Sequence, residues 1–192
     1  GRYEVITTSA GVSATLDRNC TSVGSGSLGV VNIGGALSLN STLDDDWGET
    51  LVAGNRIFVR YDASVILLGE SFTPSVVGTA ANTIKFVGYN SVRGDQPTGS
   101  TRPTISGGTS FGFTFAAYQM AENIIFIGQN SPFVSIGTNA KAANCKFINT
   151  STTAARSAVA VSGQINHCEA ISYRGYALAN SGGAGMQVYY CY

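Results

Sequence analysis

The chain has few charged side chains. Only 11% of its 192 residues are Asp, Glu, Lys or Arg, and its formal net charge is zero. No basic patch or run of like charge favours nucleic acid as a partner. Nor is any apolar run long enough to cross a bilayer, so we expect no membrane span. Strong helix formers are scarce, and 24 glycines accompany only 4 prolines. Because Val, Ile, Thr, Tyr and Phe are plentiful, the composition favours an all-β chain.

Cysteine is rare but regularly spaced. Cys145, Cys168 and Cys191 are separated by equal steps (168 − 145 = 23 and 191 − 168 = 23). Each cysteine ends a similar tetrapeptide, Ala-Ala-Asn-Cys, Ile-Asn-His-Cys or Val-Tyr-Tyr-Cys. A period in the low twenties with strand-like texture is typical of a coil that stacks on copies of itself. The sequence therefore predicts a solenoid.

The repeat extends backward if the cysteine position is an inward apolar slot that Ile84 and Ile124 also fill. Apolar and polar residues alternate after this slot, which places one row of side chains inside the coil and the other outside. Stacked coils lie about 4.8 Å apart, so equivalent side chains should form internal ladders. We predict one ladder of Ile84, Ile124, Cys145, Cys168 and Cys191, and a second of Phe86, Phe126 and Phe147.

Short apolar runs between the slots, at residues 133–136, 158–161 and 176–178, predict further strands in each coil. The step from Ile84 to Ile124 is longer than the others (124 − 84 = 40). We assign the excess to an excursion at residues 90–108, a segment rich in Gly, Pro, Ser and Thr. Residues 1–50 lack the repeat. We expect them to form an amino-terminal cap with one short helix at residues 35–47, and residues 51–192 to form coils that continue beyond the displayed chain.

Residues 51–60 (Leu-Val-Ala-Gly-Asn-Arg-Ile-Phe-Val-Arg), followed by residues 78–90, resemble the opening coils of the pectin-lyase-like superfamily. The resemblance covers residues 35–192 and implies a right-handed parallel β-helix. It implies less about activity, because the superfamily includes polysaccharide lyases, hydrolases, phage tailspikes and other virion proteins.

An enzyme on this scaffold needs suitably placed acids. Glycoside hydrolysis requires two or three carboxylates facing one groove, and a lyase requires acids for calcium and an Arg or Lys base. After Asp95 the only acids are Glu122 and Glu169, and the repeat places them on different coils. We expect both to be solvated, outward side chains, and we assign no catalytic residue.

The sequence also favours no metal or cofactor. His167 is the only histidine, and its position next to an inward cysteine predicts an outward side chain. The cysteine spacing does not match a zinc site, so we expect the repeated cysteines to be free, buried thiols. Cys20 has no counterpart in the repeat, which leaves its pairing open.

Tyrosines are the most suggestive surface feature. Tyr173, Tyr176, Tyr189 and Tyr190 fall near the end of the repeat, where a rigid solenoid would display them for stacking on sugars or for burial against a neighbouring subunit. The alternative is that these rings pack within coils and turns.

These observations predict a non-catalytic structural or binding module at an extracellular or virion location. By analogy with the superfamily, we expect a phage tail or capsid-surface component that contacts other copies, other virion proteins or polysaccharide. The alternative is a polysaccharide lyase or glycoside hydrolase whose catalytic acids lie outside this chain.

Overall fold

The computed structural model describes residues 5–9, 13–16, 52–68, 71–73, 76–130, 132–153, 155–181, 186–189 and 191. The chain divides into two compact units, Gly1–Ser38 and Leu39–Tyr192. In the first unit, β1 (Val5–Ser9) and β2 (Ser13–Leu16) form an antiparallel pair. The helix expected at residues 35–47 lies outside the described residues, so a helix-containing cap at residues 1–50 stays a prediction.

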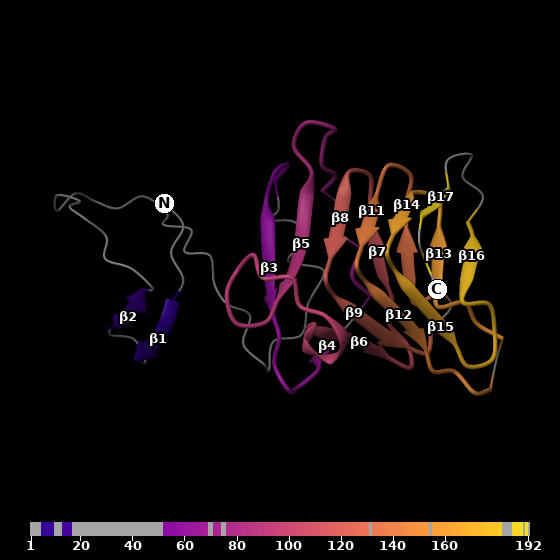
Figure 1. Cartoon of the computed structure of the whole chain (residues 1–192), viewed down its shortest axis with the longest axis horizontal. Coiled ribbons are helices and arrows are strands. Elements are labelled where there is room, and N and C mark those ends of the chain that lie inside the picture. The colour runs from indigo at the N-terminus through magenta and orange to yellow at the C-terminus, as the bar shows by residue number, and fades with distance from the viewer. Residues whose placement is uncertain are drawn as a thin grey trace. The chain divides into compact units, whose positions relative to one another are not determined.

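The second unit is a parallel β-solenoid built from three sheets (Figure 1). The six-stranded sheet contains β3 (Arg56–Arg60), β5 (Ile84–Tyr89), β8 (Gln119–Glu122), β11 (Lys141–Ala143), β14 (Gln164–Asn166) and β17 (Gln187–Tyr189). The five-stranded sheet contains β4 (Ile66–Leu67), β6 (Thr104–Gly108), β9 (Ile125–Gly128), β12 (Lys146–Asn149) and β15 (Glu169–Ser172). The four-stranded sheet contains β7 (Phe113–Phe115), β10 (Val134–Ile136), β13 (Val159–Val161) and β16 (Leu178–Asn180).

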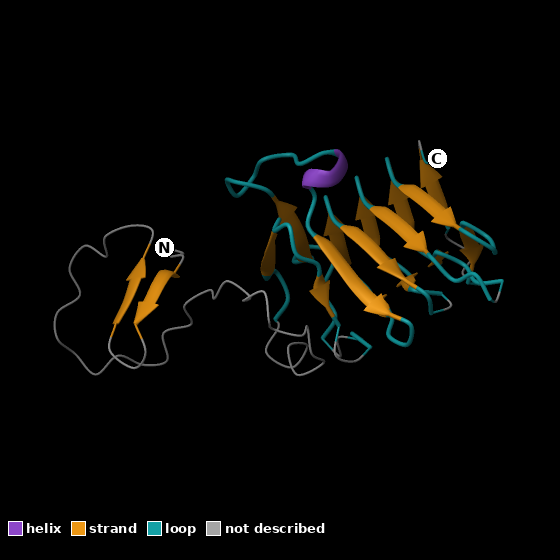
Figure 2. Ribbon diagram, turned by 90° about the horizontal axis from the view of Figure 1, so that it is seen from below, coloured by secondary structure: helices purple, strands orange, loops and turns teal. Residues whose placement is uncertain are grey.

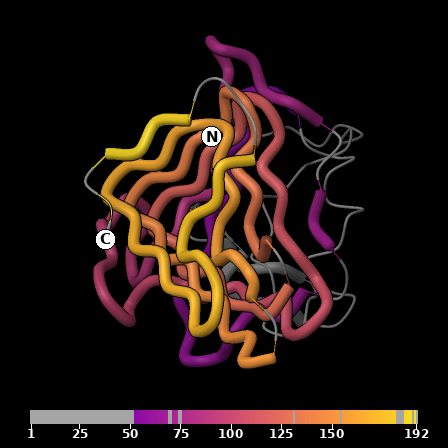
Figure 3. The backbone as a smooth tube through the Cα atoms, turned by 90° about the vertical axis from the view of Figure 1, so that its right-hand side faces the viewer, coloured from indigo at the N-terminus to yellow at the C-terminus, as the bar shows by residue number. Residues whose placement is uncertain are grey.

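Successive coils add one strand to each sheet. For example, β8, β9 and β10 pair in parallel with β11, β12 and β13 of the next coil. Figure 2 shows these strands as parallel rows, and Figure 3 shows how closely one coil follows the outline of the next. The all-β solenoid predicted from the cysteine period is therefore confirmed.

Buried and half-buried side chains alternate along the strands, and the buried ones fill the interior of the solenoid. In β9 and β12 the inward positions are buried and the outward ones half-buried, as the sequence predicts. Phe126 stacks on Phe147 with ring centroids 5.7 Å apart and ring planes 13° apart. Edge-on contacts continue the aromatic core to Phe113 at 5.3 Å and Phe115 at 5.8 Å from Phe126. The apolar core therefore runs continuously from coil to coil.

The predicted ladders are right in the later coils and wrong in the earlier one. Ile124, Cys145 and Cys168 are buried, and Lys146 N and Glu169 N donate to the carbonyls of Ile124 and Cys145 in the preceding coil. Those two hydrogen bonds confirm that these slots stack directly.

Ile84 does not belong to that ladder, and Phe86 does not belong to the ladder of Phe126. Both lie in β5 of the six-stranded sheet, where Ile84 pairs with Gln119 and Phe86 with Ala121. The position beneath Phe126 is occupied instead by Ile105. The step from Ile84 to Ile124 spans four strands (β5 to β8), whereas the step from Ile124 to Cys145 spans three (β9 to β11), so an alignment by spacing displaces these residues by one sheet.

The excursion is shorter than predicted. It begins at Asn90, but β6 (Thr104–Gly108) belongs to the five-stranded sheet rather than to the excursion. A 3-10 turn, η1 (Gly99–Thr101), is the sole helical segment within the described ranges. The buried Arg102 fastens the end of the excursion, because its Nη1 donates to the Asn144 carbonyl at 2.8 Å and its Nε to the Gly99 carbonyl at 3.2 Å.

Corners between the six-stranded and five-stranded sheets require a left-handed backbone. Asn123, Asn144 and His167 occupy equivalent corners with φ of 59°, 50° and 50°. Asparagine tolerates this conformation better than most residues with a side chain. The Asn144 side chain also donates from Nδ2 to Oδ1 of the buried Asn123 at 2.6 Å. The corner asparagines thus link consecutive coils.

Asn144→Ala should lower the free energy of unfolding by about 2–4 kcal/mol, since it adds backbone strain and leaves Asn123 Oδ1 buried without its donor. Asn139→Ala is the matched control. Asn139 has φ of 62° but is exposed, so its replacement adds strain alone, about 1 kcal/mol. Denaturant unfolding of both variants measures the difference. Equal losses would show that the asparagine bond between coils contributes nothing.

Candidate functional site

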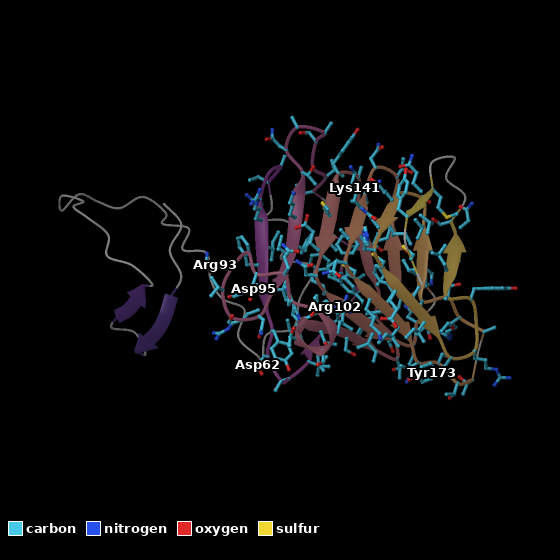
Figure 4. The ribbon with its side chains drawn as sticks, in the orientation of Figure 1. Asp62, Arg93, Asp95, Arg102, Lys141 and Tyr173 are labelled. Carbon is cyan, nitrogen blue, oxygen red and sulfur yellow. The ribbon has the colours of Figure 1, made fainter. Side chains whose placement is uncertain are left out.

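Two of the predicted contact tyrosines stand on the corner between β15 and β16. Tyr173 is 65% exposed and Tyr176 is 76% exposed. Figure 4 shows Tyr173 at the lower edge of the solenoid. Neither phenol oxygen bonds to any residue that the structure describes. The rings are therefore displayed at the surface rather than packed within the coil.

This corner is tightly held. Tyr173 N donates to the Asn149 carbonyl at 3.0 Å, and the Tyr176 carbonyl accepts from Ala158 N at 3.2 Å. Gly175 lies against the backbone of Arg156, where an added Cβ would come within 2.3 Å of the carbonyl oxygen. The two rings therefore project from a fixed backbone, which limits the conformational entropy that ligand binding would remove.

The other two predicted tyrosines do not share this corner. Tyr189 ends β17 in the six-stranded sheet and is 43% exposed, whereas Tyr190 lies outside the described residues. Of the predicted tyrosines that the structure describes, Tyr173 and Tyr176 share one corner and Tyr189 lies elsewhere.

A second surface feature, which the sequence analysis missed, is an open pocket of about 380 Å³ beside the six-stranded sheet. We call it the lysine pocket. Its lining residues are Ala80, Thr83, Lys85, Tyr118, Met120, Asn139 and Lys141. The outward side chains of Lys85, Met120 and Lys141 come from β5, β8 and β11 at directly paired positions. Tyr118 and Asn139 belong to the turns that lead into β8 and β11.

The carboxylates that the structure describes have structural partners. Glu122 lies 3.8 Å from Lys85, and Glu169 lies 3.0 Å from Lys146, each pair joining two coils. Asp62 accepts a hydrogen bond from Ser64 N at 3.0 Å. Both glutamates point outward as predicted, but each has a lysine partner rather than water alone.

Asp95 closes the turn of the excursion. Its carboxylate accepts backbone N–H groups from Asn90, Ser91 and Val92. Donation from Ser91, followed by the other backbone donors, lowers the pKa of Asp95. The guanidinium of the neighbouring Arg93 lies over the Phe58 ring at 5.5 Å. Asp95 thus fastens the turn of its own loop, and Arg93 holds that loop against β3; Figure 4 labels both residues.

The cysteine column is part of the core. Cys145, Cys168 and Cys191 are free thiols, and each donates to the carbonyl two residues earlier, at 3.3, 3.3 and 3.2 Å. Burial raises the pKa of Cys145 well above its usual value. The interaction with the neighbouring Cys145 side chain lowers the pKa of Cys168. The predicted free, buried thiols are confirmed for Cys145 and Cys168, whereas Cys191 is half-buried and Cys20 lies outside the described residues.

No metal-binding cluster of His, Cys, Asp and Glu occurs in the part of the chain that the structure describes. His167 is exposed, as predicted. No helix in the described part is long and apolar enough to cross a membrane. Comparisons with family models, curated proteins and solved structures gave no match.

Proposed function

We propose that this solenoid is a non-catalytic binding module that contacts glycans through Tyr173 and Tyr176. The observation that carries the proposal is the exposure of both rings on one fixed corner. A tyrosine ring offers a large apolar face with few rotatable bonds, so stacking on the apolar face of a sugar ring costs little ordering. The corner displays both rings without any rearrangement of the coil.

The contacts of the carboxylates support the non-catalytic part of the proposal. Glu122 and Glu169 form ion pairs between coils, and Asp95 accepts backbone N–H groups of its own turn. A general acid in glycoside hydrolysis needs a raised pKa, whereas the pKa of Asp95 is lowered. Incubation with neutral and acidic polysaccharides tests this part. Release of reducing or unsaturated ends would contradict it and favour a lyase or hydrolase.

The tyrosine contact predicts a specific binding defect. The double variant Tyr173→Ala, Tyr176→Ala should lose at least about tenfold in affinity for the glycans that the native protein retains on an array, because each ring supplies stacking area worth roughly 1 kcal/mol. The melting temperature should stay unchanged, since both rings are exposed.

The matched control is the double variant Tyr173→Phe, Tyr176→Phe, which keeps both rings and removes only the hydroxyls. It should retain most of the affinity if stacking dominates. Equal affinity of the alanine variant and the native protein would overturn the tyrosine contact.

The wider setting is proposed on resemblance alone. We place the module on the surface of a phage tail or capsid, in contact with other copies or other virion proteins. Purification of particles from the native source, followed by immunoblotting, tests this location. Recovery of the protein only in the particle-free fraction would overturn it.

A further inference from the structure

The lysine pocket combines positive charge with apolar surface. Lys85 and Lys141 flank Met120, and because neighbouring strands are about 4.8 Å apart, the two lysine backbones lie roughly 10 Å apart. Arg56 pairs with Lys85 in the preceding strand, which extends the same outward row of cations. Tyr118, Met120 and Ala80 supply apolar and aromatic surface beside them.

Little negative charge offsets these lysines. Glu122 approaches Lys85, but at 3.8 Å between partly exposed groups the pair contributes little. Lys141 is exposed and forms no ion pair with any residue that the structure describes. The pocket therefore presents a cation that is available to an anionic ligand.

The backbone of Tyr118 provides an independent observation. It has φ of 57°, a left-handed conformation that is a true outlier for a bulky aromatic residue. At the equivalent turn of the next coil, the residue with φ of 62° is Asn139, a type that tolerates this conformation. Tyr118 N donates to the Asn139 carbonyl at 3.3 Å, and its own carbonyl accepts from Ile84 N at 3.1 Å. The neighbouring coils thus hold the strained tyrosine in place.

Asparagine would satisfy this turn at lower cost, so the fold does not account for the tyrosine. Strained residues concentrate at binding sites, where a side chain is required that the local backbone disfavours. At this turn the strained side chain lines the lysine pocket. The strain and the unpaired cation therefore indicate the same site.

We infer that the lysine pocket binds an oxyanion carried on a saccharide, either a carboxylate or a sulfate ester. Lys141 and Lys85 bind the oxyanion, and the Tyr118 ring and Met120 contact the apolar face of the sugar that carries it. This inference rests on the proposed glycan contact and adds a second, separate subsite. Lys141 and Tyr173 lie at opposite edges of the solenoid (Figure 4).

The test uses the full chain and three hexasaccharide probes: heparin-derived for sulfate, hyaluronan for carboxylate and chitohexaose as the neutral reference. Isothermal titration at low salt should give binding of at least one acidic probe. Lys141→Gln should weaken that binding about tenfold and reduce its salt dependence, whereas chitohexaose affinity should not change. Lys146→Gln removes a lysine outside the pocket and should leave binding of the acidic probe within twofold.

Tyr118→Asn separates binding from folding. It should raise the melting temperature by about 2–4 °C, since asparagine relieves the left-handed strain, and it should weaken binding of the acidic probe about tenfold. A merely structural tyrosine would leave binding unchanged.

The two proposals fail in different ways. If neither acidic probe binds, or if Lys141→Gln binds as well as the native protein, the lysine pocket is overturned while the tyrosine corner still stands on its own array result. If the double variant Tyr173→Ala, Tyr176→Ala keeps full affinity for the array glycans while Lys141→Gln loses affinity for the acidic probe, the tyrosine corner is overturned and the lysine pocket stands. Because heparin carries carboxylates as well as sulfates, binding of heparin without binding of hyaluronan identifies sulfate, and equal or tighter binding of hyaluronan identifies carboxylate.

Discussion

Phe126→Ala is expected to lower the free energy of unfolding by about 3–5 kcal/mol, the range for removal of a buried aromatic ring from a packed core. Phe126 is fully buried. It stacks on Phe147 and contacts Phe113 and Phe115 edge-on. Phe113 and Phe115 belong to β7 and Phe147 to β12, so Phe126 joins the preceding coil to the following one and its replacement opens a cavity between them. The surrounding strands are fixed by hydrogen bonds on both sides, which restricts collapse into the cavity.

Urea unfolding followed by circular dichroism measures this loss. Leu67→Ala is the control, because Leu67 lies in the same sheet but is 59% exposed. Its replacement should change stability by less than about 0.5 kcal/mol. A loss below roughly 1 kcal/mol for Phe126→Ala would mean that the aromatic core does not bind the coils together.

The solenoid could be predicted from the sequence because equivalent positions in successive coils have the same surroundings and therefore select similar residues. Three consecutive coils place Ile124, Cys145 and Cys168 in the same dry slot, so the sequence carries the period directly. Alternation then identified inward and outward faces without knowledge of the turns. These are local constraints on each coil, and a single sequence reports them well.

Register across the irregular coil was not predictable. The 40 residues from Ile84 to Ile124 (124 − 84 = 40) can be divided between strands and excursion in several ways. Only the observed pairing of Ile105 with Phe126 selects one of them. The same ambiguity concealed the lysine pocket. Lys85 and Met120 are paired in the sheet, but their separation in sequence differs from the usual step, so spacing alone could not place them together.

The two candidate sites also differ in whether their residues are neighbours in sequence. Tyr173 and Tyr176 were identifiable because they lie in one turn, where neighbours in sequence are neighbours in space. Tyr118 had one usable signal in the sequence: it stands one step before Asn139 (139 − 118 = 21), equal to the step from Ile124 to Cys145 (145 − 124 = 21). Its strained backbone could not be inferred, because it depends on hydrogen bonds to Ile84 and Asn139 from other coils.

Gly88→Ala is expected to be the most disruptive substitution of a single methyl group. Gly88 is buried in β5, at the point where the next coil turns its corner. An added Cβ would lie 2.0 Å from the Asn123 carbonyl oxygen and 2.8 Å from Pro103 Cγ. The backbone cannot move aside as a flexible side chain can. We therefore expect the free energy of unfolding to fall by about 3 kcal/mol or more, at or beyond the upper end of the usual cost of overpacking a core.

Gly108→Ala distinguishes crowding from conformational strain. Gly108 has φ of +55° and no atom within 4 Å of an added Cβ, so its replacement should cost only about 1 kcal/mol, from the left-handed backbone. Gly88→Ala should also disturb Asn123, and thereby the asparagine bond to Asn144 that joins two coils. Hydrogen exchange measured by mass spectrometry should then show faster exchange in β8 and β9 for Gly88→Ala but not for Gly108→Ala. Similar exchange and stability of the two variants would contradict close packing between coils, and would indicate that the strand ladders alone hold the solenoid together.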